Sequence, residues 1–97
     1  SLMAVDALPY LDKFRVGFIG SYGNRWANLA LSKADLLIVL GSRLDIRQTG
    51  SQVEEFAKNK KIFHIDVDTN EVNNRIQGCI EISTDLESFF NSINDNL

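Results

Sequence analysis

The chain has 97 residues, of which 44% are hydrophobic and 24% charged, with a formal net charge of −3. This length suits one small domain. The lysines and arginines are scattered rather than gathered into the basic stripe of nucleic-acid-binding proteins, and no apolar run approaches the roughly 18 residues of a membrane span. The single cysteine, Cys79, cannot form an internal disulfide, so we expect a cytoplasmic domain with no nucleic-acid or membrane partner.

The first part of the chain is glycine-spaced and predicts loop rather than regular structure. Residues 1–23 contain Pro9 and the spaced glycines Gly17, Gly20 and Gly23. Residues 24–33 follow with good helix formers and predict a helix in which Trp26 belongs to the core. Tyr22, just before it, is expected at an interface.

Three runs predict strands. Residues 35–41 form a run that is continuously apolar after Asp35 up to Gly41, which is typical of a parallel strand covered on both faces. Residues 61–68 and 79–83 have a similar β-branched or aromatic bias. We therefore expect a parallel sheet.

Helical patterns separate and follow these runs. Residues 51–57 begin with Ser51 and have glutamate three positions later, a capping-box pattern, and residues 69–72 predict a short helical turn capped by Thr69. The last helix is capped by Thr84 or Asp85, and an apolar stripe follows at Leu86, Phe89, Phe90 and Ile93. The pattern is that of an α/β domain with a parallel sheet and flanking helices.

Two segments carry residues suited to anion binding. Residues 17–24 have the spacing G-x-x-G-x-x-G before a helix, which fits either a phosphate loop or a tight surface turn. Residues 41–47 follow the strongest strand and contain Arg43, Asp45 and Arg47. The two arginines can hold a phosphate or an adjacent loop, because ligands of open α/β sheets bind at strand carboxyl ends. The alternative is a solvated turn with one Arg–Asp pair.

Acidic residues end the second strand. Asp66 can accept a ribose hydroxyl, as in dinucleotide-binding folds, whereas Asp68 is better explained as a cap of the following turn. His64 lies within a strand pattern and is expected to be a core residue, and Cys79 a small buried hydrophobe. No nucleophile elbow and no metal-ligand spacing is present, so we expect neither catalytic residues nor a metal site.

Residues 20–31, 34–50 and 62–68 together resemble the middle domain of the acetolactate synthase family. The resemblance runs from about Gly17 to Phe90 and rests on A-D-L-L-I-V-L-G-S-R-L-D-I-R-Q-T-G followed by I-F-H-I-D-V-D. It implies a Rossmann-like parallel sheet of the deoxyhypusine-synthase-like NAD/FAD-binding type. It also implies two flanking domains that bind thiamine diphosphate and Mg²⁺ across a dimer interface.

In that family the middle domain binds FAD in a structural role, binds ADP, or binds nothing. The resemblance places a nucleotide site at ten positions: Gly20, Ser21, Tyr22, Gly41, Ser42, Arg43, Asp45, Arg47, Asp66 and Asp85. Ser42 and Leu44 depart from the Gly-Ala-Arg-Phe that accompanies FAD, and Tyr22 stands where synthases carry histidine. These departures favour a paralogous carboligase or decarboxylase acting on 2-oxo acids, that is, a transferase or lyase.

The resemblance further implies that residues 1–97 are a single domain, the C-terminal part of the middle domain. The catalytic glutamate and the Mg²⁺-binding segment belong to the flanking domains, and the parent forms a homodimer or tetramer. We therefore expect no turnover from this chain alone, and we expect its uncovered sheet edge to promote association.

Two other interpretations remain open from the sequence. One is a stand-alone FAD- or NAD-binding module of related fold, of the deoxyhypusine-synthase or sirtuin type. The other is an interaction domain whose strand ends bind only protein. Titration with FAD, ADP and NAD separates them, because the interaction domain is stabilised by none of these ligands.

Overall fold

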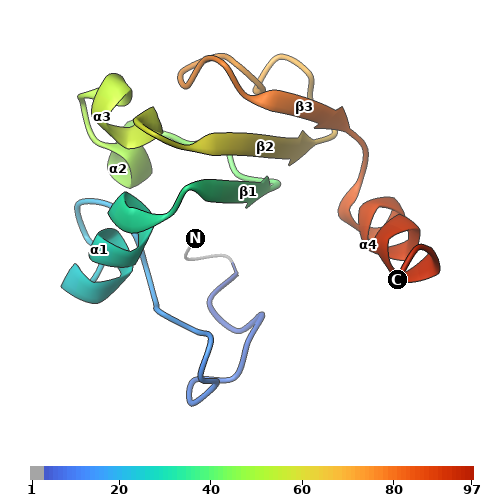
Figure 1. The fold of residues 1–97 in the computed structure, drawn as a ribbon, viewed down its shortest axis with the longest axis horizontal. Coiled ribbons are helices and arrows are strands. Elements are labelled where there is room, and N and C mark those ends of the chain that lie inside the picture. The colour runs from blue at the N-terminus through green and yellow to red at the C-terminus, as the bar shows by residue number, and fades with distance from the viewer. Residues whose placement is uncertain (1–3) are drawn as a thin grey trace. The chain divides into compact units, whose positions relative to one another are not determined.

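The computed structural model describes residues 4–97, which gather into two compact units. Unit 1 takes in the chain up to Ala34 together with residues 44–58, and unit 2 takes in residues 35–43 and 59–97. Figure 1 follows the chain through both units.

Unit 2 is built on a parallel sheet of three strands in the order β1-β2-β3. The strands are β1 (Leu36–Leu40), β2 (Lys61–Asp66) and β3 (Ile80–Ser83), and Figure 1 shows them side by side. Val39 on β1 pairs with His64 on β2, which in turn pairs with Glu81 on β3. The three predicted strands and the α/β class are confirmed. The prediction that the first strand is covered on both faces is wrong within the described residues, because Leu36, Ile38 and Leu40 are exposed.

The connection from β2 to β3 is a series of turns that buries apolar residues of its own. The helical turn predicted at 69–72 is instead an ordinary turn, in which the amide of Glu71 donates to the carbonyl of Asp68 at 3.1 Å. The capping acceptor is Asp68 and not Thr69, since Asp68 Oδ1 accepts the amide of Asn70 at 3.0 Å. Val72, Ile76 and Cys79 are buried.

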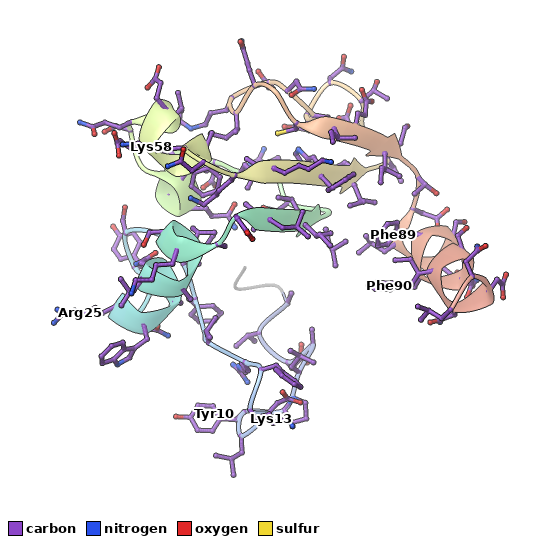
Figure 2. All side chains as sticks on the ribbon, in the orientation of Figure 1. Tyr10, Lys13, Arg25, Lys58, Phe89 and Phe90 are labelled. Atoms are coloured by element: carbon purple, nitrogen blue, oxygen red, sulfur yellow. The ribbon has the colours of Figure 1, made fainter. Side chains whose placement is uncertain are left out.

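The last helix of unit 2 begins where the sequence predicts. Helix α4 (Leu86–Asp95) is capped by Asp85. Phe89 and Phe90, labelled in Figure 2, meet edge to face with ring centroids 5.5 Å apart. Phe89 is half-buried, whereas the other members of the stripe stay exposed.

Unit 1 contains α1 (Arg25–Lys33), α2 (Ile46–Thr49) and α3 (Val53–Ala57). The helix predicted at 24–33 is confirmed, but Trp26 is 70% exposed and Ala27 is the buried residue of α1. The core prediction for Trp26 is therefore wrong, because the neighbouring Ala27 takes the inward position of this helix. The capping box is also wrong: α3 begins after Gln52 without a side-chain cap hydrogen bond. Helix α2 was not predicted.

Candidate functional site

Gly20 lies at a close crossing between two segments of unit 1. Its φ is +98°, and a Cβ at this position would collide with the carbonyl oxygen of Arg47 and lie 2.9 Å from the carbonyl carbon. The next amide, of Ser21, donates to the same oxygen at 2.8 Å. We call residues 18–24 the Gly20 turn; only glycine permits its close approach to α2.

Four amides of the Gly20 turn, those of Gly20, Ser21, Gly23 and Asn24, are already engaged within the protein. The amide of Gly20 donates to Asn28 Oδ1 at 2.7 Å, and those of Gly23 and Asn24 donate to the carbonyls of Gly20 and Phe18. An anion cradle needs such N–H groups pointing at the ligand. Of the two sequence interpretations, the geometry therefore favours the tight turn, in which the side chains of Ser21 and Tyr22 are exposed.

Asp45 organises α2 through backbone contacts. Its Oδ1 accepts the amides of Arg47 at 3.0 Å and Gln48 at 3.2 Å, as an N-cap does. The carboxylate thus contacts the backbone of Arg47, while the Arg47 side chain is exposed. In unit 1, then, the structure brings together Gly20, Ser21 and Arg47, and Asp45 fixes the helix that carries the arginine.

In unit 2 the predicted residues collect at one edge of the sheet, the one formed by the carboxyl ends of its strands. Gly41, Ser42 and Arg43 follow β1, Asp66 is the last residue of β2, and Asp85 comes shortly after β3. The amide of Gly41 donates to the carbonyl of Ile65 at 2.8 Å, which continues the ladder past the end of β1. Parallel strands place their carboxyl ends together, where open α/β sheets bind ligands.

His64 fixes the segment that follows β1. Its side chain is 1% exposed, and Nε2 lies 2.6 Å from the carbonyl oxygen of Ser42. Because a carbonyl only accepts, Nε2 must carry the proton and donate. Nδ1 is buried and has no hydrogen-bond partner among the described residues. The prediction of a core histidine is confirmed, and its polar edge holds Ser42 in place.

The two carboxylates of this edge differ in what they can still accept. Asp66 Oδ1 accepts the amide of Asp68 at 2.9 Å; a carboxylate has about four acceptor sites, so capacity remains for a hydroxyl. Asp85 uses both oxygens on Ser88, at 2.7 Å to the amide and 3.0 Å to Oγ. These bonds, the amide's first, lower the pKa of Asp85. Asp85 is thus primarily the cap of α4.

Each unit therefore offers groups of the kind that bind nucleotides. Unit 1 presents the Ser21 hydroxyl, the Tyr22 ring and the Arg47 guanidinium, and unit 2 presents Arg43 and Asp66. Guanidinium groups bind phosphates and stack on planar rings, aromatic rings stack on bases, and a carboxylate accepts ribose hydroxyls. These residue types fit FAD or ADP. Asn28 and His64 hold the backbone next to them. No sequence spacing marked Asn28, because its partner is a backbone group.

Two hollows in unit 1 are lined by residues 4–18 and, in one of them, by Asn24 as well. Their volumes are about 260 and 330 Å³. Arg15, common to both, donates from Nη1 to the carbonyl of Leu8 at 3.2 Å, and its guanidinium lies over Tyr10. Neither hollow is lined by any of the predicted site residues, so we assign them no role.

Metal-ligand clusters and membrane-spanning helices are both missing from the part of the chain that the structure describes. Nowhere in residues 4–97 do three or more histidine, cysteine, aspartate or glutamate side chains gather closely enough to hold a metal ion. Over the same range every helix is too short or too polar to cross a bilayer.

Comparison with known proteins gives a consistent result. Residues 1–93 match the family described as thiamine pyrophosphate enzyme, central domain. Over 87 residues, or 90% of this chain, the sequence is 40% identical to acetolactate synthase isozyme 1 large subunit of Escherichia coli K12. It is 35% identical over its whole length to the chloroplastic acetolactate synthase 2 of Nicotiana tabacum. The chain spans only 15% and 14% of the lengths of these two relatives.

Proposed function

The chain belongs to the family of thiamine pyrophosphate enzyme central domains, and we propose that it acts as the nucleotide-accommodating, non-catalytic part of an acetolactate synthase-like enzyme. The observation that carries this proposal is the family match over residues 1–93. The exposed side chains of the Gly20 turn and of the sheet edge support it, because they suit a nucleotide.

We assign the contacts to FAD or ADP as follows. In unit 1, Arg47 neutralises phosphate charge and the Tyr22 ring stacks on a planar ring system; in unit 2, Arg43 neutralises phosphate charge. In unit 1, Ser21 offers a hydrogen bond to a phosphate or hydroxyl group, and Gly20 keeps the backbone close. In unit 2, Ser42 and Asp66 offer such hydrogen bonds, and Gly41 keeps the backbone close. Bound FAD would supply structural order here rather than redox chemistry. Asp45 and Asp85 act by capping the helices next to these residues.

The chemistry itself belongs to other parts of the proposed parent enzyme. Those parts hold thiamine diphosphate and Mg²⁺ and act on a 2-oxo acid, as a carboligase or decarboxylase, in a dimer or tetramer. The support is that the relatives are acetolactate synthases and that this chain spans only a small share of their length. We place the parent in the cytoplasm because the one cysteine is free and buried.

One face of the sheet suits contact with such flanking domains. Leu36, Ile38 and Leu40 share a face of β1 and are 50%, 51% and 39% exposed. Among residues 4–97, β1 pairs with β2 alone, so its outer edge is open. Association of the isolated chain through this face stays a prediction, and light scattering at high concentration that shows a clean monomer would count against it.

Activity assays test the division of labour. The purified 97-residue chain, supplied with thiamine diphosphate, Mg²⁺ and pyruvate, should give neither CO₂ nor acetolactate. The protein encoded by the complete reading frame should turn over a 2-oxo acid under the same conditions. Turnover by the 97-residue chain would overturn the non-catalytic assignment, and a complete protein without any thiamine-dependent activity would overturn the parent assignment.

A further inference from the structure

Asn28 closes the Gly20 turn from helix α1. Its Oδ1 accepts the amide of Gly20 at 2.7 Å, and its Nδ2 donates to the carbonyl of Gly20 at 3.1 Å. Both polar groups of one residue's backbone are thus held by one side chain. These two hydrogen bonds are partly buried.

The turn is fixed a second time from helix α2. Ser21, the next residue, donates its amide to the carbonyl of Arg47 at 2.8 Å. The backbone that carries Ser21 and Tyr22 is therefore held between α1 and α2. Neither contact uses the side chains of Ser21, Tyr22 or Arg47, all of which are exposed.

We propose that Asn28 is a positioning residue for the nucleotide site: it presets the Gly20 turn, which carries Ser21 and Tyr22 and whose Ser21 amide is bonded to the backbone of Arg47. The ligand class is a planar, anionic nucleotide, FAD or ADP, so this inference rests on the proposed function. A preset turn raises affinity because binding no longer has to order it.

The pair of hydrogen bonds to the backbone of Gly20 requires asparagine. Facing an N–H and a C=O at once takes an acceptor and a donor on one short side chain, which an amide supplies. The substitution Asn28→Asp keeps the acceptor but turns a second oxygen toward the carbonyl of Gly20. In Asn28→Ala both bonds are lost, while the contact between Ser21 and Arg47 has no direct reason to break.

A matched control exists in unit 2. Asn73 makes the same two bonds to Cys79, with Cys79 N to Oδ1 at 2.6 Å and Nδ2 to the carbonyl at 3.1 Å. Cys79 precedes β3 and so lies at the amino end of that strand, opposite the edge that carries Asp66. Asn73→Ala removes equivalent bonds, with added strain because the φ of Asn73 is +57°.

The test measures two quantities on the wild-type 97-residue chain and on the variants. Dissociation constants for FAD and ADP come from calorimetric titration, and the exchange rates of the Gly20 and Ser21 amides come from NMR on the ligand-free protein. For whichever of the two ligands the wild type binds, we expect Asn28→Ala to raise the dissociation constant about tenfold. This change corresponds to the loss of about one hydrogen bond's net contribution. Exchange at Gly20 should quicken. The dissociation constant and the exchange rate of Asn28→Asp should fall between those of the wild type and of Asn28→Ala. If Asn28→Ala does not fold, Asn28→Asp tests the positioning role in its place.

Asn73→Ala should leave the dissociation constant unchanged and quicken exchange at Cys79 alone. Wild-type affinity in both Asn28 variants would overturn the positioning role while leaving the proposed function intact. An equal loss of affinity in Asn73→Ala would also overturn it, since general loosening would then be the cause. If the wild-type chain binds neither FAD nor ADP, the proposed nucleotide site fails and the positioning role fails with it.

Discussion

Two asparagines, one in each unit, close a turn by the same pair of hydrogen bonds. Asn28 holds the backbone of Gly20, and Asn73 holds that of Cys79, with distances that agree within 0.1 Å for both bonds: 2.7 and 3.1 Å in the first case, 2.6 and 3.1 Å in the second. The surroundings differ. The Cys79 turn, residues 73–79, is backed by buried Val72 and Ile76, whereas the Gly20 turn is pressed against a helix backbone and carries exposed polar side chains. The same local chemistry therefore supports a core in one unit and a candidate ligand surface in the other.

The largest expected difference lies in the glycines of the two turns. Gly20→Ala should reduce the free energy of unfolding by about 3 kcal/mol or more, because strain at a positive φ adds to a collision with the carbonyl of Arg47. Gly78, in the Cys79 turn, has a φ of +80°, but a Cβ added there would meet open space. Gly78→Ala should therefore reduce the free energy of unfolding only by the backbone strain, about 1–2 kcal/mol. Urea denaturation of both variants measures the gap, and equal losses would show that the crossing is not tight.

A second test concerns the segment after β1, which a buried side chain holds. His64→Phe keeps a ring in the core but removes the donor to the carbonyl of Ser42, so we expect a loss of about 1–3 kcal/mol. His64→Gln can place an N–H near the position of Nε2 and should lose less. If chemical denaturation gives the same stability for His64→Gln and His64→Phe, the hydrogen bond to Ser42 does not contribute to the free energy of unfolding.

Cys79 reports opening of its own turn. Burial raises the pKa of its thiol, and Sγ lies 3.4 Å from the carbonyl of Ile76, so alkylation in the folded state should be slow. Asn73→Ala should speed the reaction with iodoacetamide about tenfold, because the turn opens more often. Asn28→Ala, in the other unit, should leave this rate unchanged. Faster alkylation in Asn28→Ala would mean that the two turns open together.

The smallest effect is the pH dependence of the α4 cap. Hydrogen bonds from Ser88, the amide's first, hold the pKa of Asp85 below its ordinary 3.8. The folded state therefore binds this proton less readily than the unfolded chain. The contribution of the cap is complete above pH 3.8 and is lost as the pH falls through the lower folded-state pKa. In Asp85→Asn, which keeps a capping oxygen, the acid dependence of the free energy of unfolding should be weaker. An unchanged dependence would show that the ionisation of Asp85 does not contribute to it.

Sequence reasoning succeeded where a residue acts through local pattern. The apolar runs predicted β1, β2 and β3, and the stripe after Asp85 predicted α4 and its cap, because a strand or an amphipathic helix is encoded by its own neighbours. Trp26 and Ser51 were misassigned, since a side chain's burial and a cap's hydrogen bond depend on what packs against them.

The Gly20 turn shows where such reasoning ends. Its glycine spacing was visible, but the crossing with Arg47 joins positions far apart in the chain, and Asn28 contacts only a backbone. The structure places Gly20, Ser21 and Arg47 together in unit 1, and Gly41 to Arg43, Asp66 and Asp85 at one edge in unit 2. Whether these residues bind a nucleotide stays a prediction.

The most direct test of the nucleotide-accommodating role is a thermal titration of the 97-residue chain with FAD, ADP and NAD. We predict that FAD or ADP raises the melting temperature in a concentration-dependent way, as a ligand at 100 times its Kd stabilises by about 2.7 kcal/mol. Arg47→Ala should lose most of that shift. No stabilisation by FAD or ADP at millimolar concentration would contradict the account, and stabilisation by NAD alone would favour a stand-alone dinucleotide-binding module.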